Sequence, residues 1–350
     1  MRAVVYHGRG DLRVTDVAEP QVGAGQVTLQ VGYNGICGSD LHEYFAGPIF
    51  IPDGAPHPLT GRELPLTLGH EFSGTVVEVG SGVTSVAEGD RVAVEPLYTC
   101  GQCDRCGSGR YNACSSIGFH GLMHDGGMAE YTVVPATMLH KLPDSVSLEM
   151  GALVEPMAVA FHAAKLGQVR GGDTAVVFGA GPIGIGLWHA LKGTGVESVF
   201  VVEPSPTRRA AIEKLGATTL DPTSVDVPES VKDATGGKGA DAAYDAAGVQ
   251  AAIDTAVATV GAGKPLVSVA IYEKPLEVTL LSLVLAESRI QGSLCYTGDD
   301  YRAVIELMSR GHYDTTGWME KIAMADVVQE GFDALHAGHK MKVLVDPSLG

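Results

Sequence analysis

The chain has 350 residues, of which 45% are hydrophobic, so it is long enough to bury a sizeable core and to form two domains. Its formal charge is −17, from 24 Lys and Arg against 41 Asp and Glu, and its longest basic cluster is the pair Arg208 and Arg209. This balance excludes an electrostatic binder of nucleic acid and a protein that binds an anionic membrane surface.

The N-terminus enters an alternating, strand-like pattern at once, and no apolar run reaches the length that spans a membrane. We therefore expect a soluble, cytoplasmic protein. The chain has six cysteines, and four of them fall within residues 100–114. In a cytosolic chain such a group indicates metal binding rather than disulfides.

The first 150 residues consist of short apolar or alternating segments that are separated by Gly and Pro. These segments are residues 3–6, 12–18, 26–34, 74–80 and 90–94. Many short strands joined by Gly-rich turns predict a barrel-like β domain. Residues 47–65 interrupt it with five prolines and little periodicity, and we name them the Pro-rich loop. A loop of this length is either a surface excursion or a functional lid.

The four clustered cysteines are spaced as C-x2-C-x2-C-x7-C. They are Cys100, Cys103, Cys106 and Cys114. Four thiolates close a tetrahedral zinc site and leave no open position, so such a site stabilises a loop and performs no chemistry. A zinc ribbon that binds nucleic acid is the rival interpretation, and the acidic balance of the chain speaks against it.

Three further short motifs carry groups suited to chemistry. Cys37 stands two residues before Ser39 and five before His42, so a soft ligand, a hydroxyl and an imidazole lie close together. An imidazole and a carboxylate are adjacent at residues 70 and 71, which is also typical of a hydrogen-bonded loop pair. Glu155 precedes Pro156 at the predicted start of a helix over 151–162, where a carboxylate also favours the helix dipole.

A strand predicted over 173–178 is followed by Gly-Ala-Gly-Pro-Ile-Gly at residues 179–184, a helix over 185–192 and a strand over 198–202 that ends in Glu203. This order is the fingerprint of a dinucleotide-binding unit. Its glycines let the backbone approach a pyrophosphate, which would meet the N-terminus of the helix. The predicted cofactor-binding residues of the turn are Gly179, Gly181, Pro182, Ile183 and Gly184.

Glu203 is expected to bind the two hydroxyls of the adenosine ribose and to repel a 2′-phosphate, which favours NAD over NADP. Arg208 and Arg209 weaken this inference, because an arginine here can accommodate that phosphate. Both arginines also fit an exposed helix start. We expect NAD and include Arg208 among the cofactor-binding residues.

The alternation of strands and helices continues to residue 295. Strands are expected over 240–248, 265–271 and 289–295, with a helix over 250–260 and Cys295 in the core. Six strands with intervening helices make a doubly wound parallel sheet. Residues 296–350 are too short for a domain, so their helix (301–309) and strand (341–345) are expected to complete the N-terminal unit. We expect a catalytic domain of residues 1–157 and 296–350, and a dinucleotide-binding domain of residues 158–295.

With these motifs in this order, the chain resembles the zinc-containing medium-chain dehydrogenase/reductase superfamily over essentially its whole length. The resemblance rests on Gly-Ile-Cys-Gly-Ser-Asp at 35–40, Gly-His-Glu at 69–71, the four-Cys lobe, the 179–184 turn and Glu203. Val-Glu-Pro at 154–156 is similar to the polyol dehydrogenase branch. Residues 47–52 and 58–74 resemble the (R,R)-2,3-butanediol dehydrogenases. The fold that this implies is a GroES-like β-barrel catalytic domain with a Rossmann domain.

The resemblance also implies roles for individual residues. Cys37, His70 and Glu155 would be the protein ligands of a catalytic zinc, and Glu71 either a ligand in some states or a neighbour that exchanges with Glu155. Ser39 would pass the substrate proton by way of the nicotinamide ribose to His42. The cofactors implied are NAD and two zinc ions per chain, one catalytic and one structural, and the family suggests a homodimer or homotetramer.

The reaction that the resemblance implies is hydride transfer between NAD and a secondary alcohol with a vicinal oxygen, with 2,3-butanediol and acetoin as the substrate pair. Two enzyme alternatives share this mechanism, a sorbitol-like polyol dehydrogenase and an L-threonine dehydrogenase. An alternative of another class is a zinc- and dinucleotide-binding protein without catalysis. The open zinc site and the pair Ser39 and His42 argue against it, because a purely structural protein needs neither.

Overall fold

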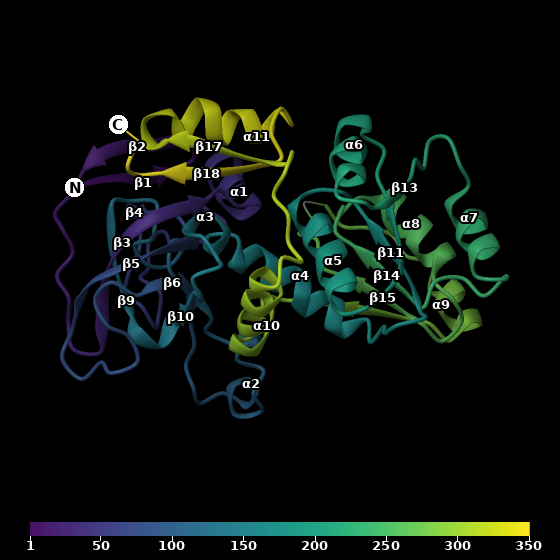
Figure 1. The fold of residues 1–350 in the computed structure, drawn as a ribbon, viewed down its shortest axis with the longest axis horizontal. Helices are drawn as coiled ribbons and strands as arrows, with labels where there is room; N and C mark the ends of the chain where they lie inside the picture. The colour runs from purple at the N-terminus through teal and green to yellow at the C-terminus, as the bar shows by residue number, and fades with distance from the viewer. Residues whose placement is uncertain (273, 350) are drawn as a thin grey trace. The chain divides into compact units, whose positions relative to one another are not determined.

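The computed structural model describes residues 1–272 and 274–349, which form two compact units (Figure 1). The first unit consists of Met1–Glu155, Thr297–Ser309 and Met319–Gly350, and the second consists of Pro156–Tyr296 and Arg310–Trp318. Within the described ranges no helix combines the length and the apolar character needed to cross a bilayer.

The first unit is built on mostly antiparallel sheets. The larger sheet has the order β10-β6-β5-β3-β18-β17 with β9 also paired to β3, and a smaller one has the order β2-β1-β4. The strands are β1 (Arg2–Gly8), β2 (Asp11–Asp16), β3 (Gln26–Gly35), β4 (Leu66–Thr67), β5 (Glu71–Val79), β6 (Arg91–Val94), β7 (Leu97–Tyr98), β8 (Gly118–Phe119), β9 (Tyr131–Pro135), β10 (Leu139–Lys141), β17 (Met319–Ala323) and β18 (Lys342–Asp346). The short, Gly-separated strands that the sequence predicts are present here, as expected for the GroES-like domain.

The helices of the first unit are short. They are α1 (Gly38–Ala46), α2 (Asp104–Gly107), α3 (Leu148–Gly151), α10 (Gly298–Ser309) and α11 (Ala334–His336). Helix α4 (Val154–Leu166) begins at the end of the segment Met1–Glu155 and continues in the second unit. Single turns lie at η1 (Tyr111–Ala113), η2 (Ala136–Met138) and η3 (Met324–Asp326), and η4 (Val327–Asp333) is a π-helix. Helix α1 begins after Cys37 and is not predicted by the sequence pattern. Its first turn is capped because the Asp40 carboxylate accepts the Cys37 N–H at 2.9 Å.

The second unit contains a sheet with the strand order β13-β12-β11-β14-β15-β16, in which every pair is parallel. This order, with helices on both faces, is the doubly wound fold that the sequence predicts. Figure 1 shows α5 on one side of the sheet and α8 on the other. The strands are β11 (Thr174–Phe178), β12 (Ser198–Val202), β13 (Thr218–Leu220), β14 (Ala242–Asp245), β15 (Pro265–Ser268) and β16 (Arg289–Gly292), and the helices are α5 (Pro182–Gly193), α6 (Pro206–Lys214), α7 (Val227–Ala234), α8 (Gln250–Thr259) and α9 (Leu280–Ala286).

The C-terminal segment returns to the first unit by strand pairing and by a buried hydrogen bond. Strand β18 pairs antiparallel with β3, and the Tyr301 hydroxyl on α10 donates to the Val94 carbonyl at 2.8 Å. Residues 310–318 differ from the expectation and belong to the second unit, where the Tyr313 ring packs on His189 of α5 with 5.0 Å between ring centroids. Cys295 is also not a core residue, because it is only half-buried and has a φ of +50°.

Candidate metal and cofactor sites

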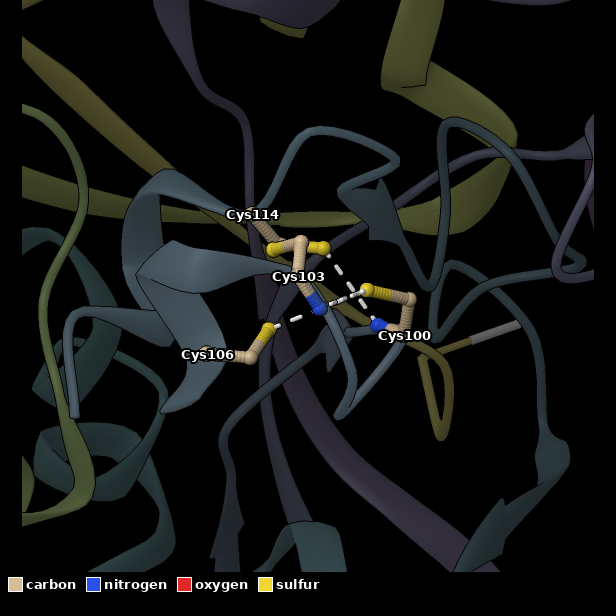
Figure 2. A group of neighbouring side chains, drawn as sticks. All are labelled: Cys100, Cys103, Cys106 and Cys114. Atoms are coloured by element: carbon tan, nitrogen blue, oxygen red, sulfur yellow. Dashed lines mark hydrogen bonds between the residues drawn. The ribbon is translucent and has the colours of Figure 1, made fainter. Parts of the chain in front are cut away.

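The four cysteines of the 100–114 lobe come together in space. Their sulfur atoms all lie within 4.8 Å of one another, and Figure 2 shows them turned toward a common space. Helix α2 supplies Cys106, and η1 precedes Cys114. The four cysteines therefore form the cluster that their C-x2-C-x2-C-x7-C spacing predicts, and the four-thiolate set matches a closed structural zinc site.

Backbone N–H groups favour the thiolate form of Cys100 and Cys103, whereas burial and the neighbouring sulfurs raise the pKa of Cys106 to about 12. The Cys103 N–H donates to Cys100 Sγ at 3.4 Å, and the Ser116 N–H donates to Cys114 Sγ at 3.4 Å. Hydrogen bonds from the backbone of Ser115 and Cys106 lower the pKa of Cys103 to about 5. Because zinc binds the thiolate form, these donors show that the residues present fit the metal.

A second group of candidate ligands consists of Cys37, His70 and Glu71. One ligand atom from each lies within 4.8 Å of the other two. Three neighbouring strands bring these residues together. Cys37 lies just after β3, and Glu71 begins β5 opposite Gly35. The third strand, β18, begins with Lys342, which contacts Glu71. Three residues far apart in sequence thus meet at one end of the sheet.

Two glycines allow this close approach. A Cβ on Gly35 would lie 2.1 Å from Glu71 Oε2, so a larger residue there would displace the carboxylate. Gly69 has a φ of +102°, and a Cβ on it would lie 2.3 Å from Asn34 Oδ1 and 2.7 Å from the Met128 nitrogen. Glycine is therefore favoured before His70 on two grounds: the backbone has a positive φ there, and a side chain would clash with its neighbours.

The Glu71 carboxylate is buried and paired with a cation that the sequence analysis missed. Lys342 Nζ contacts Glu71 Oε2 and also donates to the Ile36 carbonyl at 3.0 Å. Burial opposes the charged ammonium, but Glu71 and Cys37 outweigh it and hold the pKa of Lys342 above its usual range. The other oxygen of Glu71, Oε1, has no hydrogen-bond partner among the described residues. A buried carboxylate oxygen without a donor is suited to binding a metal cation.

Asp40 stands behind His70. Its Oδ1 lies 3.6 Å from His70 Nδ1, and both side chains are buried. Burial raises the pKa of Asp40 to about 6, against the lowering effect of His70 and of the Cys37 N–H. A carboxylate behind an imidazole orients the ring and raises its basicity, which is the usual outer partner of a metal-binding histidine.

The opposite ring nitrogen of His70 faces the Ser39 hydroxyl, with 3.3 Å between Nε2 and Oγ. Burial lowers the proton affinity of His70, but the negative charges of Asp40, Cys37 and Glu155 prevail and raise its pKa well above the usual value. The same surroundings attract a metal cation. The donor set of a thiol, an imidazole and a carboxylate also fits zinc.

Glu155 lies outside the compact group that Cys37, His70 and Glu71 form among the described residues. It is buried, with 5% of its surface exposed, and its charge raises the pKa of both His70 and Lys342. Of the two candidate glutamates, Glu71 is therefore the one that joins Cys37 and His70 in this group. The structure places Glu155 close enough to act on the site electrostatically.

The dinucleotide turn has the geometry that its glycines predict. Gly179 has a φ of +98°, and a Cβ on Gly184 would lie 1.9 Å from the Gly179 carbonyl oxygen. Gly181 precedes the first residue of α5, Pro182, so the helix N-terminus opens directly at the turn. This arrangement leaves backbone N–H groups at the place where a pyrophosphate binds in such units.

Glu203 follows β12 and is 4% exposed. Its Oε2 accepts the Ala180 N–H at 2.8 Å, and its Oε1 accepts the Ser205 N–H at 2.8 Å. The carboxylate is thus fixed beside the glycine turn. Arg209 is also committed, since it forms an ion pair with Asp221 at 2.8 Å and donates to the Glu203 carbonyl.

Two family models match the chain. The alcohol dehydrogenase GroES-like domain covers residues 23–144, and the zinc-binding dehydrogenase model covers residues 182–310. The (R,R)-butanediol dehydrogenase of Bacillus subtilis (strain 168) is 42% identical over 99% of this chain and 100% of that protein. The chain belongs to the zinc-containing medium-chain dehydrogenase/reductase superfamily.

Further relatives agree with this assignment. The (R,R)-butanediol dehydrogenase of Neisseria gonorrhoeae is 36% identical, with 100% of each chain covered. The crystal structure of the 2R,3R-butanediol dehydrogenase from Bacillus subtilis superposes with a TM-score of 0.93 at 41% identity and covers 99% of both chains. The dehydrogenase fold is therefore shared over essentially the whole length of the chain.

The closed cysteine site gives a direct prediction. Replacing Cys103→Ser should remove about one of two zinc ions per chain, because three thiolates and a hydroxyl hold the metal less tightly. The melting temperature should fall by roughly 5–10 °C. Metal analysis and a thermal scan measure both, with Cys295→Ser as the control, since Cys295 lies outside both ligand groups. Full zinc content in Cys103→Ser would contradict the assignment.

The ion pair of Lys342 with Glu71 gives a second prediction. Lys342→Met should lower the free energy of unfolding by about 3–5 kcal/mol, because it leaves a buried carboxylate without its cation. The double variant Lys342→Met, Glu71→Gln should recover part of this loss, since the orphaned charge is gone. Urea unfolding of the wild type, both single variants and the double variant completes the cycle. Additive effects of the two changes would show that the pair is not coupled.

Proposed function

We propose that this protein is a zinc- and NAD-dependent dehydrogenase that interconverts 2,3-butanediol and acetoin. The observation that carries the proposal is the group of Cys37, His70 and Glu71 with the Ser39 hydroxyl beside it. It provides ligands on one side and a proton acceptor on the other, unlike the closed four-Cys lobe. The two butanediol dehydrogenases to which the chain is similar along its full length support the substrate.

Cys37, His70 and either Glu155 or Glu71 are the ligands that we propose for the catalytic metal. A zinc ion held there would lower the pKa of a substrate hydroxyl, as it lowers the pKa of water to about 7. Asp40 keeps the His70 ring oriented, with its Nδ1 toward the carboxylate and its Nε2 toward Ser39. His70, Glu71, Glu155 and Asp40 are buried and Cys37 is half-buried, so the protein limits the access of bulk water to the proposed ligands.

Lys342 explains how two carboxylates can serve one site in turn. It holds Glu71 through Oε2 in this structure, and its charge also interacts with Glu155. When Glu155 is a ligand, Glu71 still has the ammonium as its partner and is not left as a bare buried charge. We therefore propose that Lys342 stabilises both ligand sets.

The substrate proton needs a route to solvent, and α1 provides two polar side chains for it. Ser39 Oγ lies 3.3 Å from His70 Nε2, next to the atom that would face the metal. His42 follows three residues later on the same helix, so its side chain lies on the neighbouring turn. We propose that Ser39 accepts the proton and that His42 passes it on as the general base.

The cofactor that we propose is NAD, which residues 179–184, Glu203 and Arg208 would hold and which would supply the hydride acceptor. Glu203 is held at the end of β12 by two backbone N–H groups, so a carboxylate stands where a 2′-phosphate would be repelled. Arg209 is paired with Asp221 and is not available for such a phosphate. Both contacts favour NAD over NADP.

The experiment that tests this function is a substrate panel with the purified enzyme. Acetoin reduction with NADH and 2,3-butanediol oxidation with NAD should exceed the rates with sorbitol and L-threonine. Cys37→Ser should lower kcat/KM by more than about 100-fold, because it removes a metal ligand, while circular dichroism shows the fold retained. An enzyme without activity on acetoin and butanediol would contradict the substrate. Full activity in Cys37→Ser would contradict the ligand.

We further propose that the protein is a homo-oligomer and that it works in the cytoplasm. Cytoplasmic thiols stay reduced, as both cysteine-containing groups require. For self-association the second unit offers an apolar surface on α9 and the edge strand β16, which we name the α9/β16 surface. It comprises Leu280, Leu281, Val284 and Leu285 with 69%, 62%, 69% and 78% exposed, and Ile290 with 38% exposed.

The α9/β16 surface combines two features that favour a second copy of the chain. An exposed edge strand offers unpaired backbone groups, and all four residues of β16 are exposed. Contiguous apolar side chains beside it would remain in water in a monomer. Two identical edges related by a twofold axis can pair with each other and cover both helices.

Leu285→Asp should therefore convert the oligomer to monomers, since it places a charge in the middle of the covered apolar surface. The dissociation constant should rise by at least about 100-fold, which light scattering coupled to gel filtration measures over a dilution series. Val225→Asp is the matched control, because Val225 is also exposed and belongs to the connection between β13 and α7 rather than to α9 or β16. A wild-type monomer at micromolar concentration would contradict the proposal.

A further inference from the structure

A buried carboxylate on α1 holds the start of the Pro-rich loop. Glu43 is fully buried, and its Oε2 accepts the Ile49 N–H at 2.9 Å. Its Oε1 accepts the Phe50 N–H at 2.5 Å and the Ile51 N–H at 3.3 Å. Three consecutive backbone donors therefore converge on one ionised side chain, which makes charge-assisted bonds stronger than those to a neutral acceptor.

Gly47 shows that the loop is fitted closely to this carboxylate. A Cβ on Gly47 would lie 2.4 Å from the Glu43 carbonyl oxygen and 2.7 Å from its Oε2. The Gly47 N–H and the Tyr6 hydroxyl both donate to the Glu43 carbonyl, at 2.9 Å and 2.6 Å. The backbone and the side chain of Glu43 thus both hold the turn out of α1.

The other end of the loop is fixed independently. The Asp125 carboxylate accepts the Thr67 N–H at 3.1 Å and pairs with Arg62. The loop is therefore attached at both ends, and its first residues cannot move without breaking the contacts of Glu43.

The position of Glu43 links the loop to the reaction site. Glu43 lies four residues after Ser39, so both side chains are on the same buried face of α1, about 6 Å apart along the helix axis. The segment held by Glu43 sends Ile51 into the core, with 3% exposed. It leaves Ile49 and Phe50 projecting from the loop with 52% and 42% exposed.

We propose that Glu43 is a positioning residue for substrate specificity, holding Ile49 and Phe50 as the apolar wall for the methyl groups of the diol. The identity of the diol rests on the proposed function. The hydroxyl-bearing carbons face Ser39, and the methyl groups at each end of 2,3-butanediol need apolar contacts nearby. A neutral or shorter side chain at position 43 would release the wall without touching the metal ligands.

Hydrogen exchange of the backbone amides tests the attachment without any substrate. In Glu43→Gln an amide NH₂ replaces one acceptor oxygen and faces the N–H donors of the loop, so exchange of the 49–51 amides should quicken at least about tenfold. Glu88→Gln is the control, because it makes the same change of charge at an exposed position of the first unit. Unchanged exchange in a folded Glu43→Gln would overturn the proposal.

Kinetics provide a second readout. Glu43→Gln should raise KM for 2,3-butanediol about tenfold with kcat within about threefold, because the wall binds substrate and does not enter the chemical step. Gly47→Ala should have the same effect, since its Cβ pushes the loop away while the carboxylate remains. The Gly47→Ala variant therefore still tests the proposal if the Glu43→Gln variant does not fold. A fall in kcat without a rise in KM in either variant would overturn the positioning role.

The wall itself is tested at two exposed residues whose replacement leaves the core intact. Ile49→Ala and Phe50→Ala should each lower the preference in kcat/KM for 2,3-butanediol over ethylene glycol, which lacks the methyl groups, by about tenfold. An unchanged preference in both variants would overturn the proposal that Ile49 and Phe50 form the apolar wall. A wild-type enzyme that oxidises only other alcohols would overturn the proposed function, while the exchange result would still decide whether Glu43 holds the loop.

Discussion

The buried contact between Lys342 and Glu71 is the interaction on which the first unit depends. It joins the last strand of the chain to the first residue of β5, and both side chains are almost fully buried. An isolated charge at this depth is costly, so removing either residue alone leaves its partner as a destabilising buried charge. The pair therefore makes the return of the C-terminal segment a condition for a working site, because β18 supplies the cation as well as a strand.

The two ligand groups show how backbone architecture separates structure from chemistry. The four-Cys lobe takes all its ligands from one short segment, whose own N–H groups stabilise the sulfurs. The other group takes its ligands from the ends of different strands. That arrangement needs Gly35 and Gly69 to let backbones and side chains approach. A site assembled across a sheet is held rigidly, and rigid ligands with an unfilled position are what catalysis requires.

The sequence predicted what is local and missed what is tertiary. The cysteine spacing and the 179–184 turn predict their geometry because all their groups lie within a few residues of each other. Lys342 was missed because an isolated lysine in an apolar strand has no local partner. The only sign of its role in the sequence is that a charged residue stands at a strand position that the apolar pattern predicts to be buried. Glu43 was missed for the same reason, since its three donors lie beyond the end of its helix. Lys342 contacts Glu71 and interacts electrostatically with Glu155, so the environment of both carboxylates depends on a residue that lies in neither motif.

Helix α1 connects these interactions, because one short element carries three of the side chains that make them, on adjacent turns. Ser39 and Asp40 contact His70 from its two ring nitrogens, and Glu43 fixes the loop one turn further on. A change that tilts α1 would therefore disturb proton transfer, ligand orientation and substrate fit together. The Ile49 and Phe50 side chains are exposed, whereas the backbone that carries them is tied to α1 through Glu43. Their side chains can therefore change without loss of the hydrogen bonds that hold this segment, because those bonds are made by backbone N–H groups.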